Sequence, residues 1–205
     1  MEYTPKSTLE SKFFQIPIEQ YEKDIDAGPM KENKKEILDL FTNSNYLHCE
    51  EEYKEVEYKL HLLCREGDIE LIKIYLSETL ETDSQDMTFK IDRTNKTASL
   101  FKINKNISQI TIPRTIKLES TDFLITSICG PLPDITIVKF VEDSAVKTIY
   151  RSAFTDLYPY IIAFIEEIYL PASLTDLKEG WCHGTSGLKK ITVSPLNKYF
   201  MMIED

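Results

Sequence analysis

The sequence predicts an α+β protein in which a helical N-terminal unit, residues 1–86, is followed by a short β-solenoid, residues 87–205. Apolar residues between 34 and 78 follow a helical period, whereas beyond 87 short strands recur at regular intervals. The charge changes at the same place: residues 1–86 carry 21 acidic and 10 basic side chains, and residues 87–205 carry 13 and 14. The polar stretch 81–86 is the expected linker between the two units.

Helical periodicity begins at Lys34 and predicts three helices. The first starts there, the second covers about 51–65 and the third about 69–78. Gly67 can adopt the left-handed conformation that ends the second helix, and Asp68 can cap the N-terminus of the third. The first 30 residues are interrupted by prolines and a glycine, and predict no helix.

From Met87 onward the pattern is that of β-strands. Residues around Phe89 and those at 97–101, separated by the turn 92–96, predict an initial β-hairpin. Four similar strands follow at intervals of 23 to 30 residues, and they begin at Ile110, Val138, Ile168 and Ile191. Recurrence at this spacing is typical of a solenoid, in which each turn of the coil stacks on the next.

The segments that follow two of these strands also match each other. Val146-x-x-Ile149-x-x-x-Ala153-Phe154 aligns with Leu174-x-x-Leu177-x-x-x-Trp181-Cys182. Trp181 is expected to pack at the edge of the core or to be a binding hot spot. Apolar residues at the repeat positions point into the coil, so six are expected to be largely buried: Ile149, Phe154, Leu170, Leu174, Leu177 and Ile191.

The repeats resemble the BspA-type leucine-rich repeats, whose units read as an Ile-Thr-Ile-Pro strand, a Val-x-x-Ile corner and an Ala-Phe pair. The stretches 140–154 and 174–195 resemble versions from flagellated protists, and the resemblance covers about residues 87–200. The stretch 60–78 resembles one ankyrin repeat, through Leu60-His61-Leu62 and Gly67. The resemblance implies an ankyrin-like helix pair followed by a leucine-rich-repeat solenoid, which serves protein–protein contact or adhesion without chemistry of its own.

The candidate protein-binding face is a row of residues on one side of the solenoid. If the four strands align in parallel, their outward middle residues form one line across them. Strand rows of this kind are the usual recognition surface of solenoids, although purely solvated positions are the alternative. The residues of the row are Thr111, Lys139, Tyr169 and Thr192.

Composition argues against several classes of function. The net charge of −10 disfavours binding to nucleic acid and to anionic membranes. No apolar run approaches the roughly 20 residues that a membrane-spanning helix needs, and the N-terminus lacks the pattern of a signal peptide. The four cysteines form no CxxC pair, and the neighbours His48-Cys49 and Cys182-His183 would point apart on a helix, so neither pair is expected to hold one ion. We therefore expect no metal, no cofactor, no catalytic residue and no enzymatic activity.

The expected function is non-catalytic protein–protein interaction in the cytoplasm, with a partner that the sequence does not identify. The alternative is a surface-exposed adhesion or antigen protein of the BspA-like type, which glycosylation of the sequon at Asn95 would reveal. The apolar cluster at 199–203 predicts either a truncated gene product or self-association through the C-terminal edge. Alternatively, these residues fold back over the last coil as a cap.

Overall fold

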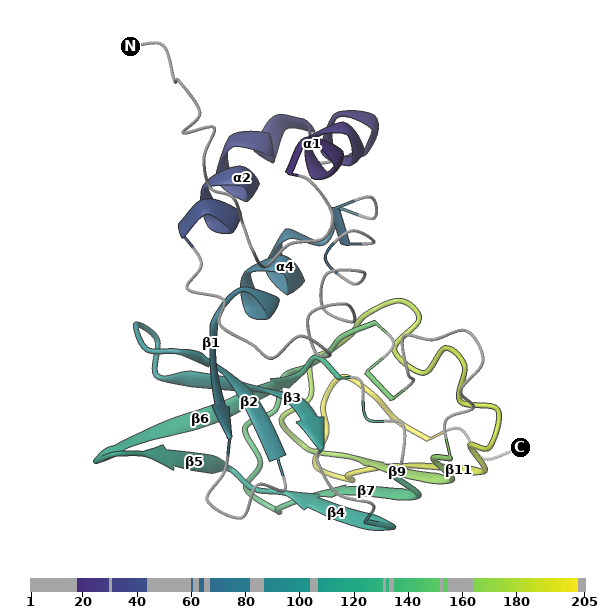
Figure 1. Cartoon of the computed structure of the whole chain (residues 1–205). Helices are drawn as coiled ribbons and strands as arrows, with labels where there is room; N and C mark the ends of the chain where they lie inside the picture. Colours follow the sequence, from purple (N-terminus) through teal and green to yellow (C-terminus); the bar gives the residue numbers. More distant parts are fainter. Residues whose placement is uncertain are drawn as a thin grey trace. The chain divides into compact units, whose positions relative to one another are not determined.

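The structure, a computed structural model, divides into two compact units, Met1–Leu76 and Ser77–Asp205. This division precedes the composition change at residue 87, because strand β1, Glu78–Glu81, pairs with a strand of the second unit (Figure 1). The residues that the structure describes are 18–29, 31–43, 60, 63–64, 67–81, 87–103, 107–130, 132, 135–151, 153–154 and 164–202.

The first unit is helical, as the sequence predicts. Its described helices are α1 (Ile18–Ala27), the short 3-10 helix η1 (Lys31–Asn33), α2 (Lys34–Asn43) and α4 (Ile69–Tyr75). The prediction that no helix lies in the first 30 residues is wrong. In α1, Tyr21 and Ile25 are four residues apart, so they share one helix face, and both are buried.

The turn before α4 confirms the predicted cap. Gly67 has a φ of 85°, which a side chain would disfavour. The Asp68 carboxylate accepts a hydrogen bond of 3.0 Å from the backbone N–H of Leu71. The predicted end of this helix at Glu78 is wrong, because the chain leaves the helix after Tyr75 to form β1. Most of the predicted helix over 51–65 lies outside the described residues, so the ankyrin-like pair stays a prediction.

The second unit contains two sheets within the described residues, which we name sheet A and sheet B. Sheet A has the order β1-β2-β3-β6-β8-β10, with β5 paired to β6. Its strands after β1 are β2 (Met87–Asp92), β3 (Thr97–Ile103), β5 (Thr115–Leu118), β6 (Thr121–Ile128), β8 (Thr148–Ile149) and β10 (Asp176–Leu177). Sheet B has the order β11-β9-β7-β4, formed by β4 (Gln109–Ile112), β7 (Ile137–Phe140), β9 (Glu167–Leu170) and β11 (Lys190–Val193).

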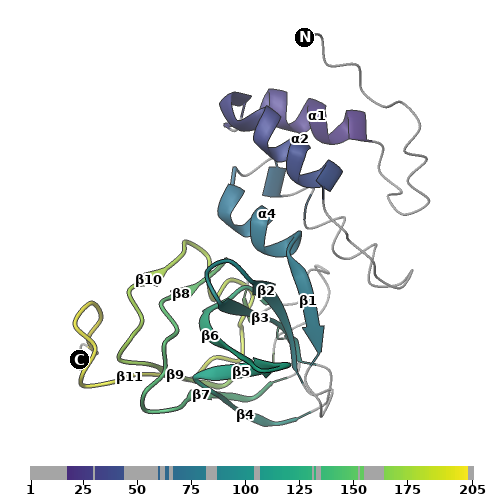
Figure 2. The ribbon, with the colours of Figure 1, turned by 90° about the vertical axis from the view of Figure 1, so that its left-hand side faces the viewer.

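The pairing of the strands confirms two predictions from the sequence. Strands β2 and β3 form the expected antiparallel hairpin. The four recurring strands are those of sheet B, and all their pairs are parallel. From β7 to β11 the chain passes alternately between the sheets, so that β8 and β10 lie on one side and β7, β9 and β11 on the other (Figure 2). The antiparallel pair of β5 and β6 was not predicted.

Two turns of the chain approach each other closely at Gly130, just after β6. This glycine has a φ of 47°, and a Cβ atom placed on it would lie 2.6 Å from the Cα atom of Ala153. The backbone N–H of Leu132 donates to the Ala153 carbonyl at 3.1 Å. The residue at this corner therefore has to lack a side chain, because the backbones of two successive turns nearly touch there.

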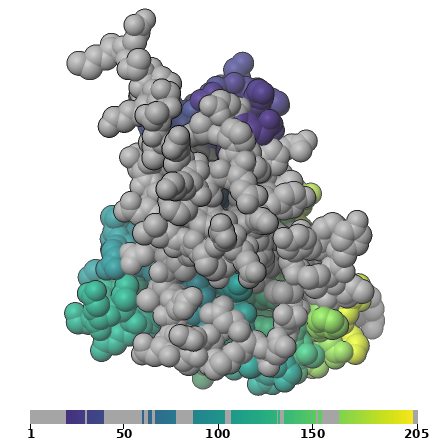
Figure 3. All heavy atoms as spheres, viewed as in Figure 1, coloured from purple at the N-terminus to yellow at the C-terminus, as the bar shows by residue number. Residues whose placement is uncertain are grey.

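After β11 the chain turns back over the preceding turn through Asn197. The side-chain amide of Asn197 donates to the carbonyl oxygens of Pro171 and Leu174 at 2.8 and 3.0 Å. Phe200 packs against the core, but its neighbours in the predicted cap do not, so the fold-back is limited to this residue among those described. The C-terminal residues also reach the surface (Figure 3), with large exposed side chains at Leu196, Tyr199, Met201 and Met202. Self-association through this edge stays a prediction.

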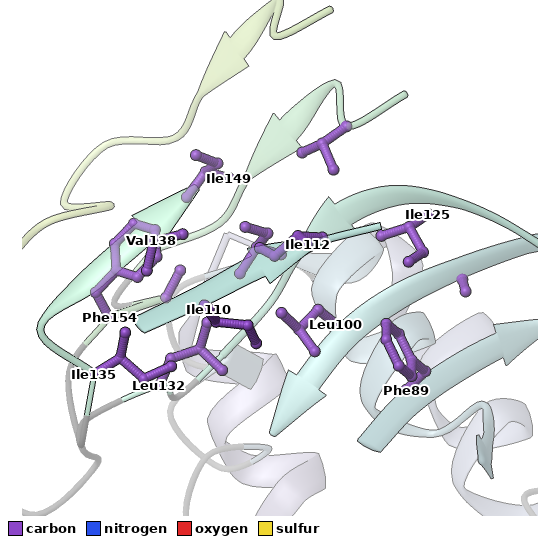
Figure 4. Packing of buried hydrophobic residues seen from close by; sticks show 14 of the residues in the cluster. Phe89, Leu100, Ile110, Ile112, Ile125, Leu132, Ile135, Val138, Ile149 and Phe154 are labelled. Atoms are coloured by element: carbon purple, nitrogen blue, oxygen red, sulfur yellow. The ribbon is translucent and has the colours of Figure 1, made fainter. Parts of the chain in front are cut away.

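The core of the second unit lies between the two sheets. Figure 4 shows side chains from both sheets meeting there, among them Val138 and Ile112 of sheet B and Ile149 of sheet A. Four of the six predicted core residues are confirmed as buried, namely Ile149, Phe154, Leu170 and Leu174. The other two, Leu177 and Ile191, pack against the same core but are only partly buried, because they lie on β10 and β11, the last strands of their sheets among the described residues.

Candidate functional site

The structure brings the four predicted site residues together in one row on the outer face of sheet B. Along each strand, side chains alternate between the core and this face. Backbone register places Thr111 beside Lys139, and Thr192 beside Tyr169. Val138 pairs with Ile168, so Lys139 and Tyr169 occupy the next position on the same two strands. Thr111 is exposed and the other three side chains are half-buried.

A second outward row runs beside the first, two residues earlier on each strand. Register aligns Gln109 with Ile137, Ile137 with Glu167, and Glu167 with Lys190. This second row was not predicted from the sequence. The signal was nonetheless present, because residues two apart on a strand share a face. The two rows together form what we call the outer face of sheet B.

Tyr169 is the centre of this outer face. The Lys139 ammonium lies 5.3 Å from the centroid of the Tyr169 ring, and the Lys190 ammonium lies 5.8 Å from it. Both distances are within the range of cation–π attraction. The two lysines come from β7 and β11, the strands that flank β9, so the aromatic ring lies between two cations.

The hydroxyl group of Tyr169 is held by its own strand. It donates a hydrogen bond of 2.9 Å to the Oε2 atom of Glu167. This bond to a carboxylate raises the pKa of Tyr169, and desolvation adds to the rise. The phenol therefore stays protonated well above neutral pH, so Tyr169 is a neutral aromatic donor and not a source of negative charge.

Two ion pairs flank the outer face at the ends of the strands. Before β9 and β11, the Lys189 ammonium lies 2.7 Å from the Glu166 carboxylate. After β4 and β7, the Arg114 guanidinium donates to the Asp143 carbonyl, and its Nε atom lies 3.8 Å from the carboxylate of the same residue. These pairs offset the charges at both ends of the strands.

Lys139 and Lys190 differ from these paired bases. Within the part of the chain that the structure describes, neither of their ammonium groups forms an ion pair. Each rests against the ring of Tyr169 and keeps its N–H donors for solvent or for a ligand. The site thus combines cations, hydroxyl groups and an aromatic ring, which are groups suited to holding an extended polypeptide by hydrogen bonds and charge.

The remaining candidate residues are not part of this face. Trp181 packs edge-on against Phe154, with ring centroids 5.9 Å apart, as expected for a residue at the edge of the core. Cys64 and Cys129 are buried free thiols, and Cys182 is half-buried. Burial raises the pKa of the Cys64 thiol to about 12, and the nearby charge of Asp24 adds to this rise. Among the described residues, no three His, Cys, Asp or Glu side chains gather as metal ligands would.

The described helices are all too short or too polar to cross a membrane.

Comparisons with known proteins give no family for the chain. No protein-family model matches it, and no curated protein matches it. Among solved structures, the pneumococcal vaccine antigen PcpA aligns over 60% of this chain and 39% of its own, with 17% identity and a TM-score of 0.39. A leucine-rich cell surface protein from Faecalibacterium prausnitzii aligns over 58% of this chain and 43% of its own, with 15% identity and a TM-score of 0.30. The chain thus spans less than half of either protein, and at these TM-scores the alignments establish neither a shared fold nor a shared function.

Proposed function

We propose that the chain is a non-catalytic protein–protein interaction module and that the outer face of sheet B is its binding surface. The observation that carries this proposal is the arrangement around Tyr169, which lies between the ammonium groups of Lys139 and Lys190. Tyrosine is enriched in protein interfaces because it combines a large apolar ring with a polar group. The neutral side chains of Thr111 and Thr192 extend this surface to the outermost strands of the sheet.

We further propose that the second unit is a short leucine-rich-repeat solenoid of the BspA type. The alternation of the chain between sheets A and B from β7 to β11 supports this, because each turn then repeats the path of the turn before it. The parallel register of the four strands in sheet B supports it as well. In such a scaffold the strands supply a rigid base, and the outward residues can vary freely to suit a partner.

The proposed location is the cytoplasm, and the second candidate is a BspA-like adhesion or antigen protein at the cell surface. One observation favours the second candidate: Asn95, in the sequon Asn95-Lys96-Thr97, lies exposed in the turn between β2 and β3. Surface labelling of intact cells, combined with mass spectrometry of the peptide that contains Asn95, distinguishes the two. A glycan on Asn95 would support the surface protein, and an unmodified, unlabelled chain would support the cytoplasmic module.

Affinity capture from the native cell tests the binding surface itself. The wild-type chain is compared with a double variant, Lys139→Ala with Tyr169→Ala, and captured proteins are measured by quantitative mass spectrometry. Lys147→Ala is the matched control, since Lys147 is an exposed lysine of the same unit that precedes β8 of sheet A. The proposal predicts that a captured protein is lost with the double variant and kept with the control. Equal capture by all three chains would reject the outer face of sheet B.

A further inference from the structure

We infer that the outer face of sheet B binds an extended acidic segment of a partner protein, in which two carboxylates two positions apart engage Lys139 and Lys190. The inference rests on the proposed function, because it specifies the chemistry of the partner at the same surface. The first observation is the charge of the side chains in the two outward rows. Two of the eight side chains are cationic and one is anionic; the neutral ones are Gln109, Thr111, Ile137, Tyr169 and Thr192.

The one acidic side chain of the rows, Glu167, already accepts a hydrogen bond within the chain. The Oε2 atom of Glu167 accepts the hydrogen bond from the Tyr169 hydroxyl, and this bond directs the carboxylate toward its own strand. The flanking charges are also matched, in the ion pairs Lys189–Glu166 and Arg114–Asp143. Two lysines and one carboxylate leave the outer face with a net positive charge, on a chain whose net charge is −10.

The two ammonium groups carry unused hydrogen-bonding capacity. Each has three N–H donors, and the aromatic ring of Tyr169 satisfies them only weakly. Within the described residues no carboxylate forms an ion pair with either one. Two like charges that share one ring also repel each other. A ligand carboxylate beside each ammonium would relieve this repulsion and supply the missing acceptors.

The spacing of the strands defines the ligand further. Neighbouring strands lie about 5 Å apart, so β7 and β11, on either side of β9, are separated by about 10 Å. The two ammonium groups lie 5.3 and 5.8 Å from the same ring centroid, so at most about 11 Å separates them. In an extended peptide, side chains on one face recur about every 7 Å. Acidic residues at positions i and i+2 of a peptide that crosses the strands therefore lie within reach of the two flexible lysine side chains.

The test uses the full-length chain and a display library of random 12-residue peptides. The library is selected on the wild-type chain, and binders that also bind the Tyr169→Ala variant are removed. The selected peptides are sequenced, and their dissociation constants are then measured for Lys139→Gln, Lys190→Gln and the control Lys147→Gln. Lys190 is exposed and Lys139 is half-buried, and a thermal transition that matches that of the wild type shows that the variants are folded.

We expect the selected peptides to contain Asp or Glu at alternate positions. Each of Lys139→Gln and Lys190→Gln should weaken their binding about fivefold, with no change for Lys147→Gln. Face-dependent peptides that are neutral or basic would overturn the acidic ligand and leave the proposed function standing. If no selected peptide depends on Tyr169, both the proposed binding surface and this inference are overturned. A separate selection on the double variant Lys139→Glu with Lys190→Glu should yield basic peptides instead.

Discussion

The ammonium group of Lys139 on β7 lies 5.3 Å from the centroid of the Tyr169 ring on β9. The two residues are far apart in the sequence and occupy matching positions on neighbouring parallel strands. Their contact follows from a register that repeats along the chain, and the hydrogen bond from Tyr169 to Glu167 holds the ring in place. Both contacts can be tested without knowledge of the partner.

Replacing Glu167 by glutamine should lower the pKa of Tyr169. The hydrogen bond to the carboxylate and, to a smaller extent, its negative charge favour the protonated phenol, so their loss makes deprotonation easier. The measurement is a pH titration of 13C-labelled tyrosine by NMR, with the Tyr169 signal assigned from the Tyr169→Phe variant. Glu142→Gln, at an exposed site, serves as the control. A Tyr169 pKa that is unchanged or raised in Glu167→Gln would contradict the hydrogen bond.

Because the pKa of Tyr169 is raised in the folded chain, the stability of the fold should depend on pH in alkaline solution. The ordinary pKa of tyrosine is 10.0, and that of Tyr169 is higher in the folded chain. The contribution of the protonated phenol to folding stability is therefore fully present below pH 10.0. The contribution is lost as pH rises through the pKa of the folded state. Glu167→Gln should therefore reduce the difference in stability between neutral and strongly alkaline solution, as measured by denaturant unfolding.

Gly130→Ala should destabilise the second unit by about 2–4 kcal/mol, since it combines left-handed backbone strain with a steric clash against the backbone of Ala153. The matched control is Gly180→Ala. Gly180 also has a positive φ, of 73°, but an added Cβ atom would meet only the flexible side chain of Arg151, at 3.3 Å. The control should cost about 1 kcal/mol, from backbone strain alone. Equal costs in urea unfolding would show that the close approach at Gly130 is absent.

Phe154→Ala should destabilise the second unit by about 3–5 kcal/mol, because Phe154 is fully buried and its ring packs against Trp181. Phe164→Ala is the control for the same chemical change at a side chain that is 61% exposed. Its effect should stay within about 0.5 kcal/mol. Chemical denaturation measures both. A loss under about 1 kcal/mol for Phe154→Ala would contradict the repeat register that places this residue in the core.

Asn197→Asp should cost about 2–3 kcal/mol, because a carboxylate cannot donate to the carbonyl oxygens of Pro171 and Leu174 and instead faces them as an anion. It can still accept the bonds from the backbone N–H groups of Tyr199 and Phe200, so the change isolates the donated pair. Leu196→Ala, at a 69% exposed side chain, is the control. A neutral result for Asn197→Asp in thermal unfolding would show that the C-terminal turn does not close over the preceding coil.

The strands of sheet B could be predicted because the same short pattern of residues occurs in each of them. Each has a branched apolar residue at its second position, buried in the first three strands (Ile110, Val138 and Ile168) and partly buried in the last, and the strands recur at intervals of 23 to 30 residues. The outward row through Tyr169 follows from the same alternation. Lys190 and Glu167, the other two groups that contact Tyr169, were equally accessible to this reasoning, since each lies two residues before a member of the row.

The features that could not be predicted from the sequence depend on contacts between distant residues or on where a helix or a sheet ends. Strand β1 continues from a helix, and only its pairing with β2, where Leu80 lies beside Phe89, makes it a strand. Pro17 and Gly28 flank α1 and do not interrupt it, although they lower the helical propensity of the region as a whole. Burial at Leu177 and Ile191 depends on whether another turn covers them, and a repeat position does not encode that.

Site-specific photo-crosslinking tests the central claim, that the outer face of sheet B contacts a protein partner, most directly. A p-benzoylphenylalanine side chain is placed either at position 169 or at position 175, an exposed site beside β10 of sheet A, and the native cells are irradiated. The account predicts a covalent adduct with one partner protein from position 169 and none from position 175. An adduct from position 175 alone, or equal adducts from both positions, would contradict it.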